Sequence, residues 1–132
     1  MSNKLAMLVG VAGLLAASLP ALAHHSFAAE YDANKPIEVK GVVTKVEWTN
    51  PHARFYVDAK DAAGKTVNWN FELASPNVLN RNGWTRKAVQ AGDEVTVQGS
   101  QAKDGSNMAN ARAVVMANGK RVFAGSSGGD GQ

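Results

Sequence analysis

Hydrophobic and polar residues alternate along much of this chain, which is the pattern of β-strands that bury one face and expose the other. The clearest run is residues 66–73, whose apolar positions are Val67, Trp69, Phe71 and Leu73. Residues 54–59 alternate in the same way, and residues 61–65 between the two runs have the composition of a hairpin turn. We therefore expect these two strands to pair.

Further strands are predicted on both sides of this hairpin. Residues 37–48 form a long run whose apolar parity changes across Gly41, as a β-bulge at that glycine would require. Alternation returns at residues 94–98 and again at 108–117, with a turn at 103–107 between them. Asn118-Gly119 is then a two-residue hairpin signal that leads into residues 120–123.

A short helix is predicted between the third and fourth strands. Ser75 is an N-cap residue, Pro76 suits the first helical position, and Gly83 ends the segment. Residues 85–90 are expected to form a second short turn. Three strands, a helix and two or three more strands are the order of an oligomer-binding (OB) fold. We predict an all-β, OB-like barrel of five to six strands; a small β-sandwich or roll is the competing arrangement.

The first residues have the composition of an export signal. Lys4 precedes the apolar residues 5–19, Pro20 follows, and Ala21-Leu22-Ala23 offers small residues to a signal peptidase. A retained membrane anchor is the alternative, but the run is shorter than the roughly 20 residues that span a bilayer. The predicted organisation is a signal peptide at 1–23, an N-terminal extension at 24–36, the barrel at 37–123 and a disordered tail at 124–132.

Cleavage between Ala23 and His24 makes the mature protein periplasmic and free of the membrane, although cleavage after Ala28 or Ala29 is the alternative. The formal net charge of the whole chain is +3, and there is no cysteine. This balance gives no strong field for nucleic acid, and a cluster at Arg81, Arg86 and Lys87 is expected to be solvated. The lack of cysteine excludes disulfides, thiolate metal sites and cysteine nucleophiles.

Catalytic constellations are nearly absent from the sequence. Ser26 lies beside His25, but no carboxylate is evident to orient a triad. Glu47 and Asp58 have the outward parity of solvated surface charges, and no glycine-rich loop opens a helix as a phosphate site requires. We therefore expect a binding protein and not an enzyme.

Three separated motifs resemble a family of short exported bacterial proteins of unknown function. They are His24-His25-Ser26-Phe27 after the signal, Trp48-Thr49-Asn50-Pro51-His52 after the first strand, and Gly105-Ser106-Asn107-Met108-Ala109 near the end. The resemblance covers nearly all of the mature chain but implies no activity. More loosely, the strand order is similar to exported bacterial OB-fold proteins thought to bind small ligands or cations, a likeness of architecture only.

The histidines are the candidate metal ligands. After cleavage at His24, that residue carries both a free α-amine and an imidazole, which together chelate one ion. A further imidazole, from His52 or from His25, completes a three-nitrogen histidine brace suited to Cu(II). His52 is the better candidate because adjacent residues seldom converge on one ion. Glu30 and Asp32 keep a mixed nitrogen and oxygen site for Zn²⁺ or Ni²⁺ open, and Phe27 and Tyr31 are expected to anchor the segment on the barrel.

Two alternatives stand beside the metal site. The N-terminal histidines are simply solvated, and His52 finishes a turn with its ring on Trp48 or on a carbonyl group. The second class of function is a metal-independent OB-type module that binds a small ligand, a glycan or a protein partner through outward-facing side chains. Its candidate residues are Trp48, Asn50, Arg54, Tyr56, Asn68, Asn70 and Trp84, whereas Trp69 is expected to be core.

Overall fold

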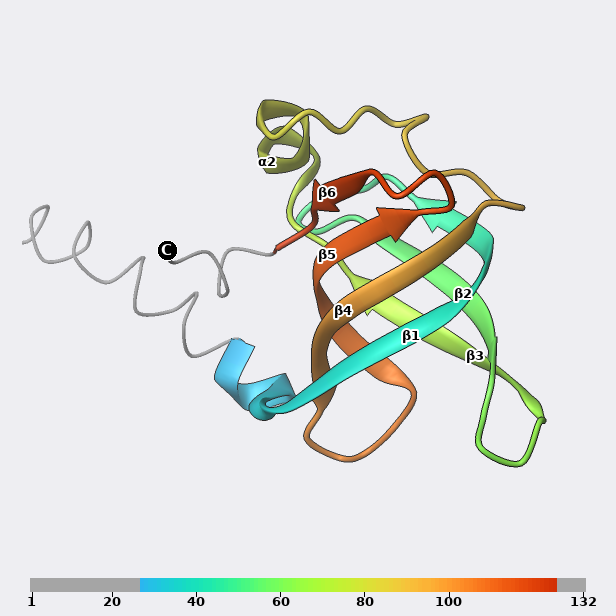
Figure 1. The fold of residues 1–132 in the computed structure, drawn as a ribbon. Coiled ribbons are helices and arrows are strands. Elements are labelled where there is room, and N and C mark those ends of the chain that lie inside the picture. The colour runs from blue at the N-terminus through green and yellow to red at the C-terminus, as the bar shows by residue number, and fades with distance from the viewer. Residues whose placement is uncertain (1–26, 126–132) are drawn as a thin grey trace, which may run out of the picture.

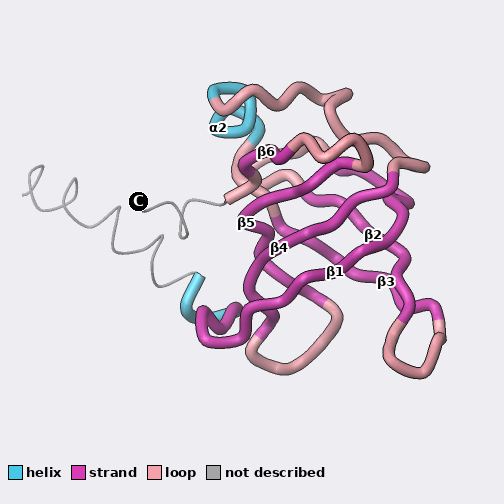
Figure 2. Tube along the Cα trace, viewed as in Figure 1, coloured by secondary structure: helices cyan, strands magenta, loops and turns pink. Residues whose placement is uncertain are grey.

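A computed structural model of the chain describes residues 27–125, and within this range it is built mostly of β-strands (Figures 1 and 2). Residues 27–30 are helical and lead directly into the first strand. The remaining elements, in chain order, are β1 (Tyr31–Glu47), β2 (Arg54–Lys60), β3 (Thr66–Glu72), α2 (Pro76–Arg81), β4 (Glu94–Ala102), β5 (Met108–Met116) and β6 (Arg121–Phe123).

The strands form one curled sheet in the order β3-β2-β1-β4-β5-β6. All neighbours in this order are antiparallel, and β3 also pairs with β5 in parallel through residues 70–72 and 108–110. This pairing joins the two ends of the five-stranded part into a ring of hydrogen bonds. With α2 between β3 and β4, the prediction of an OB-like all-β fold is confirmed.

The first strand is longer than predicted, and its irregularity lies elsewhere. It begins at Tyr31 and not at Ile37, since its first half pairs with β4 while its second half pairs with β2. The register shift against β2 falls between Val43 and Lys45 and not at Gly41, which corrects the predicted bulge. The inward parity therefore continues through Val43, and Val42 is exposed.

Gly41 has a steric role in place of the predicted bulge. It lies where β1 is paired with β2 and β4 at once. A β-carbon at this position would come within 2.1 Å of the carbonyl oxygen of Asp58 and 2.8 Å of a methyl group of Val57. Glycine is needed here because the neighbouring strand approaches the backbone too closely for any side chain.

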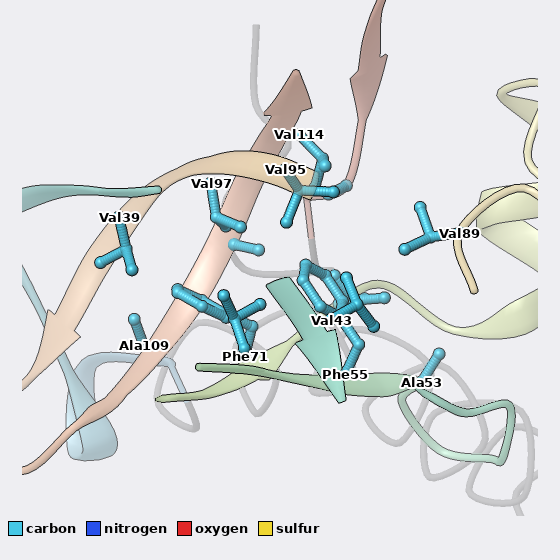
Figure 3. Packing of buried hydrophobic residues seen from close by; sticks show 14 of the residues in the cluster. Val39, Val43, Ala53, Phe55, Phe71, Val89, Val95, Val97, Ala109 and Val114 are labelled. Atoms are coloured by element: carbon cyan, nitrogen blue, oxygen red, sulfur yellow. The ribbon is translucent and has the colours of Figure 1, made fainter. Parts of the chain in front are cut away.

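The core fills the inside of the curled sheet (Figure 3). Residues 55, 57 and 59 of β2 are buried while 54, 56 and 58 are not, so the alternation predicted for this strand is confirmed. Phe55 and Phe71 pack with ring centroids 5.5 Å apart. Trp69 stacks on Phe71 at 5.9 Å as the partly buried edge of this cluster.

The predicted helix and turns are present. The Ser75 side chain accepts a hydrogen bond from the Val78 amide, and Pro76 begins α2. Residues 85–88 form a turn, and the hairpin after β5 turns at Asn118 and Gly119 as expected. Ala124, predicted to be the first residue of the disordered tail, is instead fully buried, and its backbone bonds to two other segments.

The rest of the predicted organisation falls partly outside the structure. The predicted signal peptide at 1–23 and residues 126–132 of the predicted tail lie outside the described residues. Within residues 27–125, no helix has the length and hydrophobicity that crossing a membrane demands.

We expect Gly41→Ala to lower the free energy of unfolding by about 1–3 kcal/mol, since the new methyl group must displace the backbone of β2. Urea unfolding followed by tryptophan fluorescence measures the change. Val42→Ala is the matched control, because Val42 is the next residue of the same strand, is 45% exposed and lies outside the core. Equal stability of the two variants would contradict the close approach at Gly41.

Candidate functional site

A nearly buried carboxylate, Glu72, is the centre of the most highly connected polar cluster in the described chain. Its side chain is 8% exposed and meets three donor side chains. His52 Nδ1 lies 2.8 Å from Oε1, Arg54 Nη2 lies 2.7 Å from Oε2, and the Tyr31 hydroxyl donates to Oε2 at 2.9 Å. Both carboxylate oxygens are thus engaged, which is what a buried carboxylate requires.

The hairpin register explains why Arg54 and Glu72 meet. Arg54 is the first residue of β2 and lies directly opposite Glu72, the last residue of β3, so both side chains are on the same outer face. His52 comes from the preceding β1–β2 loop. Its neighbour Ala53 extends the pairing with β3 through two backbone hydrogen bonds, to Leu73 and Ala74, which fix the loop beside Glu72.

Tyr31 approaches the same carboxylate from the start of β1. Its side chain is buried, and the ring of Phe27 packs against it with centroids 5.7 Å apart. The carbonyl of Glu30 accepts a hydrogen bond from the Lys103 amide. The expectation that Tyr31 anchors the N-terminal segment is confirmed for the described residues, and Phe27 packs on Tyr31.

The phenol of Tyr31 is held in its protonated form. Burial raises its pKa well above the ordinary value, and the charge of Glu72 and the hydrogen bond to it act in the same direction. If Tyr31 lost its proton, its negatively charged oxygen would lie next to the Glu72 carboxylate without the hydrogen bond that now joins them.

The buried polar residues of the described chain lie in one line across the sheet. Glu72 is in register with Asn110 of β5, and Asn110 is in register with Ser100 of β4. All three are less than 9% exposed although they are on the outer face of the strands. We call Glu72, Asn110 and Ser100 the polar row; Tyr31 lies against its Glu72 end.

The predicted ligand-binding residues of β2 and β3 do share one outer face, but they bond to neighbours on it. Arg54 Nη1 donates to Asn70 Oδ1 at 3.2 Å, and Asn68 Nδ2 donates to Asp58 at 2.8 Å. The Tyr56 hydroxyl lies 3.5 Å from Glu47, which also pairs with Lys45 at 2.8 Å. This face is therefore a set of internal polar pairs adjoining Glu72.

The aromatic candidates have different surroundings. Trp84 is 2% exposed and belongs to the core, so the expectation that it offers a stacking surface is corrected. Trp48 is partly buried and lines an open depression of ≈ 400 Å³ with Val46, Arg86 and Val89. Asn50, in the same loop, is exposed, and its bond to Pro51 is cis.

The predicted metal ligands are divided between the described and undescribed chain. His52 is placed on Glu72, whereas His24 and His25 lie outside the described residues. Between residues 27 and 125, no three His, Cys, Asp or Glu side chains converge as a metal site. Asp32 accepts a hydrogen bond from the Asn34 amide, so its carboxylate serves the local turn.

Glu72 is the residue that sequence reasoning missed. In the alternating run of β3 it has the parity of the wet face, as Asn68 and Asn70 do. The available signal was its charge: it is the only acid among those outward positions, opposite Arg54 in the predicted hairpin. A carboxylate paired with arginine in this way is a candidate for a partly buried ion pair.

The fold and the cluster define a small OB-like β-protein with a carboxylate-centred polar site on the outside of its ring. The chain belongs to a family of unknown function (DUF6152), whose model matches residues 11–111. This confirms the coarser part of the resemblance, membership of a family of unknown function. A comparison with curated proteins finds no match.

Glu72→Gln is expected to lower the free energy of unfolding by about 2–4 kcal/mol, because it leaves Arg54 and Tyr31 facing a neutral amide in a nearly buried position. Thermal and urea unfolding test this. Glu94→Gln is the control, since the Lys40–Glu94 pair is 72% and 55% exposed and should contribute little. A loss no larger than that of the control would show that the cluster does not hold the fold together.

The raised pKa of Tyr31 predicts a loss of stability at alkaline pH. Below pH ~10 the tyrosine is protonated in both states, and its contribution is fully present. Above pH ~10 it ionises in the unfolded chain but not in the folded one, so the free energy of unfolding falls. The fall between pH 9 and 11 should be steeper in the wild type than in Tyr31→Phe; parallel curves would contradict the shift.

Proposed function

We propose that this protein is an exported, periplasmic binding protein, and not an enzyme, that takes up Cu(II). The ligands are the α-amine and imidazole of His24, with the imidazole of His52 and, as a further ligand, His25. The signal sequence supports export with cleavage between Ala23 and His24. The contact of His52 with Glu72 supports the choice of His52 as a metal ligand.

The single observation that carries this proposal is the His52–Glu72 contact. Histidines that bind metals usually donate their other ring nitrogen to a carboxylate, which fixes the ring and raises its basicity. His52 Nδ1 lies 2.8 Å from Glu72 Oε1, so its ring has a carboxylate partner of this kind. Histidine in a solvated turn has no need of such a buried carboxylate.

The other half of the site is supported by the reach of the chain. Tyr31 bonds to the carboxylate that also meets His52, and Phe27 packs on Tyr31. His24 precedes Phe27 by three residues, a length that spans up to ~11 Å. The amine and ring of His24 can therefore reach toward this side of the barrel, where three nitrogen ligands would suit Cu(II).

A metal-independent small-ligand site is the second candidate. It is favoured by the open depression that Trp48 lines beside the His52 loop, with apolar walls from Val46 and Val89 and the guanidinium of Arg86. The polar face of β2 and β3 has fewer groups available to bind a ligand, because Arg54, Asn68 and Asn70 are hydrogen-bonded to neighbouring side chains.

Titration of the mature protein with Cu(II), followed by electron paramagnetic resonance, tests the metal site after mass spectrometry has established the first residue. We expect His24→Ala and His52→Ala each to weaken binding at least roughly 100-fold, more than a change outside the ligand set would. One alanine added before His24 is a matched control that keeps every side chain but removes the amine from His24. It should abolish the three-nitrogen spectrum.

Two results would overturn the copper proposal. One is a mature chain that begins after His24. The other is copper affinity and spectra that are unchanged in both histidine variants, which would favour the small-ligand candidate at Trp48. His25→Ala shows in addition whether that imidazole is a ligand.

A further inference from the structure

The depression beside Trp48 is formed by two segments that are distant in sequence. Val46 lies near the end of β1 and Trp48 directly follows this strand, whereas Arg86 and Val89 belong to the segment between α2 and β4. Its volume of ≈ 400 Å³ is in the range of small-molecule sites. The depression therefore has room for a small organic molecule.

The second of these segments is held against β1 by its backbone. The Gly92 amide donates to the Val43 carbonyl at 2.7 Å, and the Val43 amide donates to the Asp93 carbonyl at 2.9 Å. Val89 is 3% exposed and belongs to the core (Figure 3), against which the β1 side of the depression also packs. The walls are thus fixed by the fold, so a ligand would not have to order them.

Arg86 is the polar group of this lining that has no partner in the described chain. The side chain of Gln90, which also lines the depression, donates to the Lys87 carbonyl at 3.1 Å. Arg86 is exposed, and its guanidinium forms no hydrogen bond or ion pair with residues 27–125. Its donors are therefore available to a ligand.

The acids beside the two lining segments have partners of their own. The carboxylate of Glu47 lies 2.8 Å from Lys45 Nζ. Asp93 accepts a hydrogen bond from a backbone amide of its own turn at 2.8 Å. The charge of Arg86 is thus left to complement an anion, and a guanidinium matches a carboxylate through two parallel hydrogen bonds.

We propose that this depression binds a small aromatic carboxylate. The Trp48 ring and the aliphatic walls contact the flat apolar part of the ligand, and Arg86 pairs with its carboxylate. This inference rests on the small-ligand candidate of the proposed function and does not depend on copper. It adds the chemical class of the ligand, which the apolar walls alone would not specify.

The test uses the purified protein after its metal has been removed with a chelator and by dialysis. Benzoate is the probe, and benzamide is its uncharged counterpart of the same shape. Nuclear magnetic resonance follows the indole N–H signals of Trp48, Trp69 and Trp84, and Trp48→Phe identifies the signal of Trp48. We expect benzoate to shift this signal saturably and benzamide to bind roughly tenfold more weakly, because it lacks the charge that pairs with arginine.

Two variants separate the contact from the overall charge. Arg86→Gln should weaken benzoate binding roughly tenfold and leave benzamide binding nearly unchanged. Lys87→Gln is the matched control, since it removes the same charge from the next residue, which is not part of the described lining. Both side chains are on exposed residues, so we expect both variants to fold.

Equal binding of benzoate and benzamide by the wild type would overturn the preference for an anion but leave the small-ligand candidate in place. Equal losses in Arg86→Gln and Lys87→Gln would also overturn the inference, because long-range charge would then account for the effect. If neither probe shifts the Trp48 signal, the inference and the small-ligand candidate both fail. The copper proposal is decided separately, by titration of the histidine variants.

Discussion

The arrangement of the candidate site depends on the buried charge of one carboxylate. Glu72 is removed from water on the outer side of the sheet, and such a charge is tolerated only where donors replace its hydration. Those donors come from the start of β1, from the β1–β2 loop and from the first residue of β2. The need to satisfy one acid therefore joins the start of β1 and residues 52–54 to the end of β3.

Most of the fold could be predicted because it depends on local signals. The period of two in β2 and β3, the Ser75 cap and the Asn118-Gly119 turn each act within a few residues, and each is present in the structure. The main errors concern β1. Whether a strand bulges or needs a glycine depends on the strands beside it, and Gly41 is required by the backbone of β2, which no pattern within residues 37–48 encodes.

The site was only half predictable for a similar reason. His52 could be singled out because histidine is rare in this chain and follows a distinctive loop sequence. Its partner could not, since the burial of Glu72 comes from Tyr31 and from the closure of β3 on β5, both of which are long-range. The prediction for Trp84 was wrong in the other sense: a residue expected at the surface is buried. An aromatic residue after a short helix is equally suited to a surface or a core.

The pairing of Tyr31 with Ala102 has a consequence for the order of events during folding. The β2–β3 hairpin can form from neighbouring residues, but the start of β1 has no partner until β4 is in place. Glu72 and His52 can therefore meet early, whereas Tyr31 can join them only when almost the entire barrel has been assembled. A complete site is thus a late product of folding, and its formation reports that the ring has closed.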